Sequence, residues 1–201
     1  MNEAALAAID DAWSRTGRRV RLRLLRESDL PKRLEMTNDP QVQIETLGMT
    51  VGERTPYDIR SWFKTLSHDP SSRQIAVEDA QGRYVGDFDL HSLDARQDEG
   101  WVEPFFGDKE VRDQGQQAVA HLLTDAFETL LAYLFDEMRL SRVMVECLST
   151  HPVLLQVLHD LGFSDVGRID HMNGVISHVM ELRRDARRVP PTTLPGGSRR
   201  W

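Results

Sequence analysis

The chain has 201 residues, 40% of them hydrophobic, and a formal net charge of −7 at pH 7. This length is usual for one domain with tails. The negative charge argues against a nucleic-acid partner, and no apolar run approaches the roughly 20 residues that span a bilayer, so we expect no membrane partner. The single cysteine, Cys147, excludes an internal disulfide, and we predict no metal site and a cytoplasmic location.

Periodicity and turn signals predict a chain of alternating strands and helices. In chain order we expect a helix within residues 1–18, a strand at 19–25, a helix at 28–38, an irregular loop at 41–54, a helix at 55–66, strands at 74–79, 83–91 and 100–107, a helix at 116–135, a strand at 142–147, a helix at 152–159, and strands at 163–169 and 175–182. The tail from residue 185 is rich in Arg, Pro and Gly and is expected to be flexible.

Residues 111–135 are the most informative stretch. They begin with a polar loop, residues 112–117, and continue with apolar side chains three or four residues apart, which is one face of a buried helix. An aromatic strand precedes the loop. A strand–loop–helix unit of this kind points main-chain N–H groups, at the positive end of the helix dipole, toward one spot. Such a spot binds phosphate.

Two motifs here resemble those of the GNAT N-acetyltransferase superfamily. The polar loop is similar to its acyl-CoA pyrophosphate loop, (R/Q)-x-x-G-x-(G/A), with Arg112 and Gly115 in place and Gln117 where a second small residue usually stands. Residues 151–163 are similar to the segment N-x-x-S-x-x-x-x-E-K-L-G-F and end in the matching Leu-Gly-Phe. Residues 170–183 look like the ending of the RimJ/RimL branch, the ribosomal-protein alanine acetyltransferase type.

The resemblance covers residues 19–184 and implies an α/β (α+β) GNAT fold. In that fold a mixed, mostly antiparallel central sheet of about six or seven strands is flanked by about four helices. The acyl-CoA-binding domain would follow an N-terminal helical extension, residues 1–18, and precede the flexible tail, residues 185–201. We expect a monomer or a homodimer.

The resemblance also implies acetyl-CoA, or another acyl-CoA, as the cofactor. The residues expected to bind it are Phe105, Phe106, Gly107, Arg112, Asp113, Gln114, Gly115, Gln116, Gln117, Ala118 and His151. In this family the acyl group passes directly to an amine, which here would belong to a peptide or protein N-terminus or to a small metabolite or antibiotic. Residues 41–66 would line the acceptor pocket.

An ammonium must lose a proton before it can attack a thioester, so a base is needed. Glu99 and Glu103 lie on the strand before the loop, four residues apart and therefore on one face. Glu99 lies thirteen residues before Arg112, a spacing at which some members of this family carry their catalytic Glu. His151, where the family usually has Asn, is expected to act as an acid or to contact the cofactor.

Two other interpretations stay open. Gln117, Leu154 and Leu158 each replace a familiar functional residue of the family, Leu158 standing where many members carry a Tyr acid. These departures fit a catalytically silent module that binds acyl-CoA or a protein partner. A nucleotide-phosphate binder could use the same loop, but no Walker lysine follows Gly115.

Overall fold

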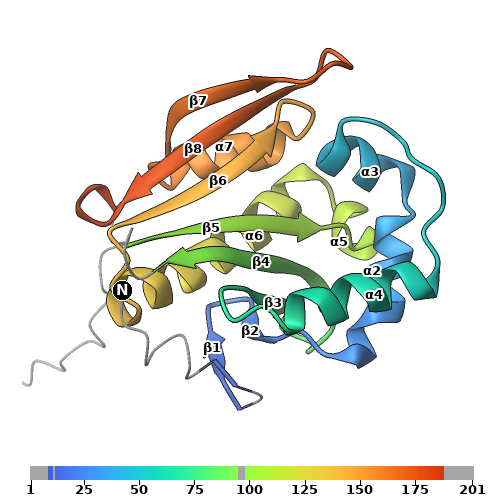
Figure 1. The fold of residues 1–201 in the computed structure, drawn as a ribbon, viewed down its shortest axis with the longest axis horizontal. Coiled ribbons are helices and arrows are strands. Elements are labelled where there is room, and N and C mark those ends of the chain that lie inside the picture. The colour runs from blue at the N-terminus through green and yellow to red at the C-terminus, as the bar shows by residue number, and fades with distance from the viewer. Residues whose placement is uncertain (1–8, 11, 95–97, 188–201) are drawn as a thin grey trace, which may run out of the picture.

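The computed structural model describes residues 9, 10, 12–94 and 98–187, and they form a single sheet covered by helices (Figure 1). The strand order is β1-β2-β3-β4-β5-β6-β8-β7. All neighbouring strands are antiparallel except β5 and β6, which are parallel. The strands are β1 (Ser14–Thr16), β2 (Arg21–Leu24), β3 (Arg73–Glu78), β4 (Tyr84–Asp94), β5 (Glu99–Phe106), β6 (Arg142–Leu148), β7 (Ser164–Asp170) and β8 (Ile176–Arg183).

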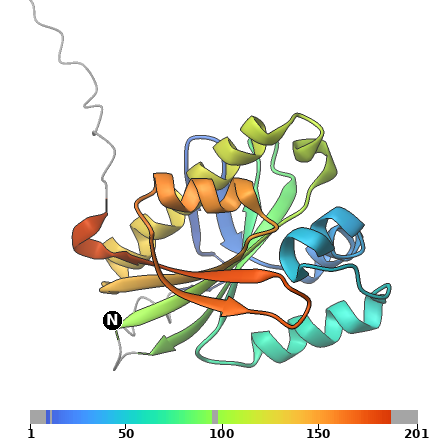
Figure 2. The same ribbon diagram turned by 90° about the horizontal axis from the view of Figure 1, so that it is seen from above.

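Helices cover both faces of the sheet. Figure 2 shows α6 and α7 on one side and α4 on the other. The α-helices are α2 (Leu30–Thr37), α3 (Pro40–Leu47), α4 (Pro56–Ser67), α5 (Lys109–Arg112), α6 (Gln116–Ala132) and α7 (Pro152–Asp160). Short turns of other helix types are η1 (Glu27–Asp29), η2 (Tyr133–Glu137) and η3 (Arg184–Ala186). The predicted fold class is confirmed, with eight strands instead of six or seven and six α-helices instead of four among the described residues.

Strand alternation gives the sheet two separate cores. On β4, Phe88 and Leu90 are fully buried against α6 and α7 in the larger core. On the opposite face Ala76 packs with Ile59 of α4 in a smaller core that includes α2. Successive side chains of a strand point to opposite faces, so Phe105 joins the smaller core and Phe106 the larger. This alternation later separates the two cavities of the candidate site.

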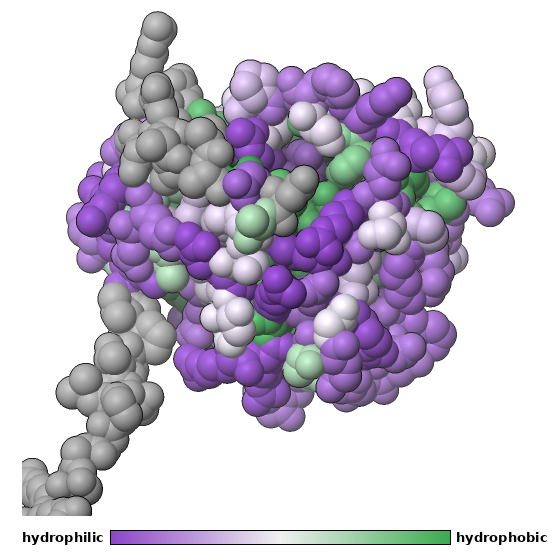
Figure 3. Space-filling view, turned by 90° about the horizontal axis from the view of Figure 1, so that it is seen from below, coloured by the Kyte–Doolittle hydropathy of each residue, from purple (hydrophilic) through white to green (hydrophobic). Residues whose placement is uncertain are grey.

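The helix α6, with η2 after it, is the apolar centre of the larger core. Together they span Gln116–Glu137 and are long and apolar enough to cross a membrane by length and composition. Their apolar side chains are nevertheless used inside the protein, since Leu123, Phe127 and Leu130 are completely buried against the sheet. The molecular face in Figure 3 is mostly hydrophilic, with hydrophobic surface confined to small patches.

The N-terminal prediction is corrected where the structure describes it. Most of the expected helix within residues 1–18 lies outside the described residues, but Ser14–Thr16 form the edge strand β1, which pairs with β2. The turn between these strands is held by Asp125 of α6, whose carboxylate accepts hydrogen bonds from three consecutive main-chain N–H groups, residues 18–20. The segment thus continues the sheet.

The loop predicted at residues 41–54 is wrong in its first half, which is helix α3. Asp39 caps this helix, because its carboxylate accepts from the main-chain N–H of Gln41 at 2.8 Å, and Pro40 occupies the first turn. Gly48 ends the helix in the left-handed conformation, with φ of +69°. Asp39-Pro40, just after the helix predicted at 28–38, thus begins a second helix.

β5 and β6 separate along their length. Their ladder runs from Glu99 opposite Arg142 to Trp101 opposite Met144 and then stops. The ladder between β5 and β4 continues to Phe106. Among the residues that the structure describes, the second half of β5 therefore has no strand partner on its β6 side, which leaves main-chain groups there for a ligand. The candidate site lies in this opening.

Candidate functional site

A cleft of about 340 Å³ lies between the end of β5, the α5–α6 loop and the start of α7. It takes its apolar wall from the face of the sheet that α6 covers, including Val85 and Phe106. Four of the residues predicted to bind cofactor line it directly: Phe106, Gly107, Arg112 and His151. A fifth, Gln116, lines it from the first turn of α6. We name it the cofactor cleft.

The phosphate loop is shorter than predicted. Arg112 ends α5 and Gln116 begins α6, so the loop is residues 113–115. The main-chain N–H groups of those three residues and of Ala118 donate to carbonyl groups nearby, at 2.8–3.2 Å. Gln116 and Gln117 are the first residues of α6, and among the described residues no carbonyl group accepts from their main-chain N–H groups. Of the predicted set, these two N–H groups are therefore the ones suited to a phosphate.

Side chains in and before this loop bind each other. The carboxylate of Asp113 accepts from Lys109 Nζ at 2.7 Å, and the Gln114 amide donates to the carbonyl of Glu110. Arg112 pairs with Asp39, the cap of α3, and donates to the carbonyl of Gly107 at 3.2 Å. Arg112 thus ties α3 to the end of β5 and the loop, a positioning role that the motif alone does not indicate.

The cleft offers unused polar groups to a ligand. Thr150 Oγ1 is buried at its wall without a hydrogen-bond partner among the described residues. A buried hydroxyl without a partner is costly, and a ligand can satisfy it. The unpaired edge of β5 beyond Trp101 adds main-chain groups suited to an extended chain with amides. These features, with the start of α6, fit the pantetheine and pyrophosphate of an acyl-CoA.

A second cavity, of about 860 Å³, opens on the other face of the sheet, beneath α3 and α4. We name it the acceptor cavity. Residues of the predicted acceptor-pocket segment, 41–66, contribute much of its lining. Its walls carry six carboxylates, namely Glu45, Asp58, Asp87, Asp89, Glu103 and Glu146. Two arginines line it as well, so the cavity is acidic and suits a cation.

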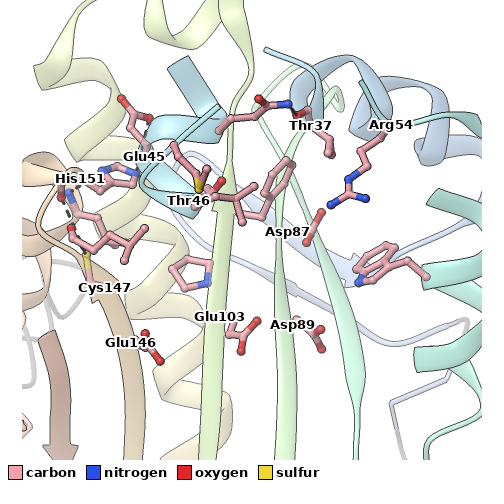
Figure 4. A pocket seen from close by; sticks show the side chains of 18 of the residues that line it. Thr37, Glu45, Thr46, Arg54, Asp87, Asp89, Glu103, Glu146, Cys147 and His151 are labelled. Atoms are coloured by element: carbon pink, nitrogen blue, oxygen red, sulfur yellow. Dashed lines mark hydrogen bonds and ion pairs between the residues drawn. The ribbon is translucent and has the colours of Figure 1, made fainter. Parts of the chain in front are cut away.

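Three of these carboxylates form a row. Asp89 on β4 lies directly opposite Glu103 on β5. Two residues beyond the last β5–β6 pair, Glu146 occupies the next strand at the same level, and Figure 4 shows all three side by side. Glu99, the other predicted base, does not line the cavity; it is ion-paired with Arg142 near the opposite end of β5. Glu103 is thus the predicted base that the structure brings to the acceptor cavity.

Glu103 is not free in this row. His91 Nε2 lies 2.9 Å from its Oε1. This hydrogen bond lowers the pKa of Glu103 and, in return, raises the pKa of His91. The pair is partly exposed, since the side chain of Glu103 keeps 61% of its accessible surface. At neutral pH Glu103 is therefore an ionised carboxylate with a partner already in place.

Asp87 likewise has a partner, because its negative charge is balanced by Arg33. It is completely buried and accepts from Arg33 Nε at 2.9 Å and from the hydroxyl of Tyr84. The Arg33 guanidinium lies between the rings of Trp62 and Phe105, with ring centroids at 3.7 and 4.3 Å. Burial by itself would lower the pKa of Arg33, but Asp87 outweighs it and the pKa is raised. This cluster is a fixed wall of the cavity.

Glu45 of α3 and His151 stand where the two cavities meet. Of the described residues, these two line both cavities. His151 Nδ1 accepts from the main-chain N–H of Leu154 and caps α7, so the ring proton belongs on Nε2. That nitrogen faces Glu45 Oε2 at 4.0 Å, and burial lowers the pKa of His151 while Glu45 opposes the shift. His151 is thus a neutral N–H donor at the junction, close to Glu45 in Figure 4.

Cys147 lines the acceptor cavity without the properties of a nucleophile. Only 2% of its surface is accessible, and burial raises the pKa of its thiol to about 12. A thiol with such a pKa is protonated at neutral pH and does not attack a thioester. The residue is a small buried packing group.

Sequence reasoning missed Glu45, Asp87 and Asp89 as site residues. The alternation of Asp87 and Asp89 with Phe88 and Leu90 does mark a polar face on that strand. Nothing local indicates what this face meets, because Arg33, Gln74 and Glu103 come from distant parts of the chain. Glu45 was hidden by the loop prediction, although Asp39-Pro40 and Gly48 mark its helix.

Comparison with solved structures finds the same fold at low sequence identity. Spermidine N-acetyltransferase from Vibrio cholerae, in complex with CoA and spermine, has a TM-score of 0.70 and 17% identity, over 83% of this chain and 96% of that one. An acetyltransferase (GNAT family) from Bacillus anthracis gives 0.68 and 17%, over 86% and 99%. A GCN5-related N-acetyltransferase from Brucella melitensis gives 0.67 and 18%, over 89% and 81%.

The sequence itself supplies the assignment. No curated protein matches the chain significantly. The model of the acetyltransferase (GNAT) domain family, however, matches residues 19–164, which include the cofactor cleft, the phosphate loop and most of the acceptor cavity. GNAT acetyltransferases use acyl-CoA as the acyl donor. The chain therefore belongs to the acetyltransferase (GNAT) domain family and is an N-acetyltransferase.

Proposed function

We propose that the protein transfers an acetyl group from acetyl-CoA to a primary amine of a small cationic acceptor. One observation carries the proposal: an acidic cavity of about 860 Å³ meets the cofactor cleft at Glu45 and His151. A carboxylate-lined cavity attracts ammonium groups and repels acids. Its junction with the cleft would bring an amine to a thioester.

The residues of the cofactor cleft have separate tasks in this proposal. The main-chain N–H groups of Gln116 and Gln117 hold the pyrophosphate at the positive end of α6. Thr150 and the free edge of β5 hold the pantetheine amides. When bound, acetyl-CoA supplies an activated acyl group as a thioester. His151 Nε2–H stands at the junction as a hydrogen-bond donor.

The acceptor cavity combines charge with apolar surface. Leu47 and Met49 line it and are about half exposed, and Met172 lines it and is fully exposed. An amine that also carries methylene groups would use both features, the ammonium at the carboxylate row and the chain against these side chains. The Vibrio cholerae enzyme binds spermine, a molecule of this chemistry. A linear polyamine is therefore the first acceptor to try.

A peptide N-terminus is the second acceptor in this proposal. The segment that looks like the RimJ/RimL ending, residues 170–183, forms β8 and the turn that joins it to β7, and His171, Met172 and Asn173 of this turn line the acceptor cavity. A backbone amine with an apolar side chain could rest on this turn. We place the reaction in the cytoplasm, where acetyl-CoA is made and used.

The test is turnover of acetyl-CoA with spermine, spermidine, an aminoglycoside and peptides with free N-termini. Release of the CoA thiol is followed optically and the product by mass spectrometry. We expect CoA release with at least one amine and an acetylated product. Binding of acetyl-CoA without release for every amine would overturn the catalytic proposal and leave an acyl-CoA-binding module. Acetylation confined to lysine side chains of proteins would overturn the choice of acceptor.

A further inference from the structure

The carboxylates of the acceptor cavity differ in whether the protein gives each a partner. Asp87 has Arg33, and Glu103 has His91. Glu45 faces His151 at 4.0 Å, and Glu146 faces His171 at 3.9 Å. Asp58 accepts from the main-chain N–H and the hydroxyl of Thr55, as part of the cap of α4. Asp89 forms no ion pair with any described residue.

Asp89 lies on the cavity floor with one weak neutral partner. Gln74 Nε2 of β3 donates to its Oδ1 at 3.2 Å. Asp87 and His91 flank it on the same face of β4, and Glu103 lies opposite on β5. A carboxylate in this position is partly desolvated, and the cations near it, Arg33 and His91, are already paired with Asp87 and Glu103. Its missing counter-ion is a cation that the protein does not supply.

We propose that Asp89 binds the ammonium group of the acceptor and takes its proton. The proposal rests on the proposed function and names the base for it. In this step an N–H bond of the ammonium breaks and an O–H bond forms on the Asp89 carboxylate. The products are a neutral amine, whose nitrogen lone pair is free to attack a carbonyl carbon, and a neutral carboxylic acid. The acid later returns its proton to water through the open cavity.

The electrostatics of the site support this role. Burial raises the pKa of Asp89 to about 6, with Glu103 and Asp87 adding to the rise, while the hydrogen bond from Gln74 and the charge of His91 oppose it. Arg33 of α2 also faces Asp89, but its guanidinium is held by Asp87. A base is most effective when its pKa lies near the working pH. Glu103, with a lowered pKa, is the weaker base of the opposed pair.

The test compares Asp89→Asn with Glu103→Gln in the full chain, using the best amine of the acceptor panel. Asn is close in size to Asp and can still accept from Gln74, so the fold should be kept. We expect Asp89→Asn to lower kcat by about 10²–10⁴-fold. The rise of kcat through pH 6 should disappear, and acetyl-CoA affinity in calorimetry should stay unchanged. Glu103→Gln should keep the rise and lose less activity.

A second variant keeps Asp89 and changes its environment. Gln74→Leu removes the hydrogen bond that Gln74 donates to the Asp89 carboxylate and that stabilises its charged form, so the pKa of Asp89 should increase. The rise of kcat should then move to higher pH. Full activity of Asp89→Asn with an unchanged pH profile, or an unmoved profile in Gln74→Leu, would overturn the assignment. In both cases wild-type turnover would still support the proposed function, whereas an inactive wild type would overturn that function itself.

Discussion

Gly115 has a main-chain conformation that other residues rarely adopt. Its φ and ψ are +95° and 168°, a region that is essentially restricted to glycine. A Cβ built there would meet no atom within 4 Å, so the position opens to solvent or to a ligand. Two physical constraints therefore favour glycine at this position of the loop motif. The main chain has a conformation that only glycine adopts readily, and a side chain would project into the space that the pyrophosphate would take.

The variant Gly115→Glu should abolish acetyl-CoA binding, because it places a carboxylate beside the site expected to hold the pyrophosphate. Gly115→Ala is the matched control, since it has the same backbone strain, about 1–3 kcal/mol, without the charge. Both variants should lose similar stability in thermal unfolding, and only the glutamate should lose all affinity in calorimetry. Equal affinities for the two variants would locate the pyrophosphate elsewhere.

For single residues, the sequence predicts main-chain features such as caps and left-handed glycines well. It predicts poorly which side chains contact each other across the fold. Gly115 and the cap Thr55 could be predicted, because their roles depend on neighbours within a few residues. The role of Arg112 was expected at the phosphate, yet its partner Asp39 lies 73 positions away. Asp89 depends on Gln74 and Glu103 in the same way. Such contacts are set by the tertiary fold and leave no mark in the local sequence.

Among the elements, α3 connects the fold to the chemistry. It carries Glu45 to the junction of the two cavities, and Arg112 ties its first turn to the phosphate loop. Its last turn packs on the β7–β8 hairpin, where a Cβ on Gly48 would lie 2.8 Å from Val175 Cγ2. The helix is only eight residues long, so its position depends on these contacts at both ends.

Replacing Gly48 by alanine should therefore loosen α3. A left-handed conformation costs a residue with a Cβ about 1–2 kcal/mol, and the contact with Val175 adds to that cost. We expect a lower Tm and weaker binding of the amine, measured as a higher KM for the acceptor. Gly52→Ala is the control, because its Cβ would meet nothing within 4 Å. A Tm that falls equally in both variants would contradict this account.

The two element predictions that failed have different physical origins. The signals for α3 are present in the sequence, as a cap, a proline in the first turn and a final glycine. The strand β1 has no such signal. Three residues form it because Asp125, more than a hundred positions away, holds the turn that follows. Tertiary contacts decide such short edge strands.

For the whole molecule, the order of strands and helices was predictable from the sequence. The polar loop at residues 112–117 and the segment at residues 151–163 each resemble a motif with a known position in the GNAT fold. The separation of β5 from β6 was not predictable, since parallel strands that diverge leave no local mark. Where the two strands separate, the acceptor cavity on one face of the sheet meets the cofactor cleft on the other face. Phe105 lines the acceptor cavity and Phe106 the cofactor cleft, so the two sites are separated by the thickness of one strand.

This arrangement has a consequence for steady-state kinetics. In the proposed reaction each substrate has its own cavity. The two cavities share only Glu45 and His151 among the described residues, so both substrates could be bound at once. Cys147, with a pKa of about 12, is not fit to store the acyl group between half-reactions. Double-reciprocal plots at several fixed amine concentrations should therefore intersect. Parallel lines, together with exchange of labelled CoA into acetyl-CoA in the absence of amine, would instead reveal a ping-pong enzyme.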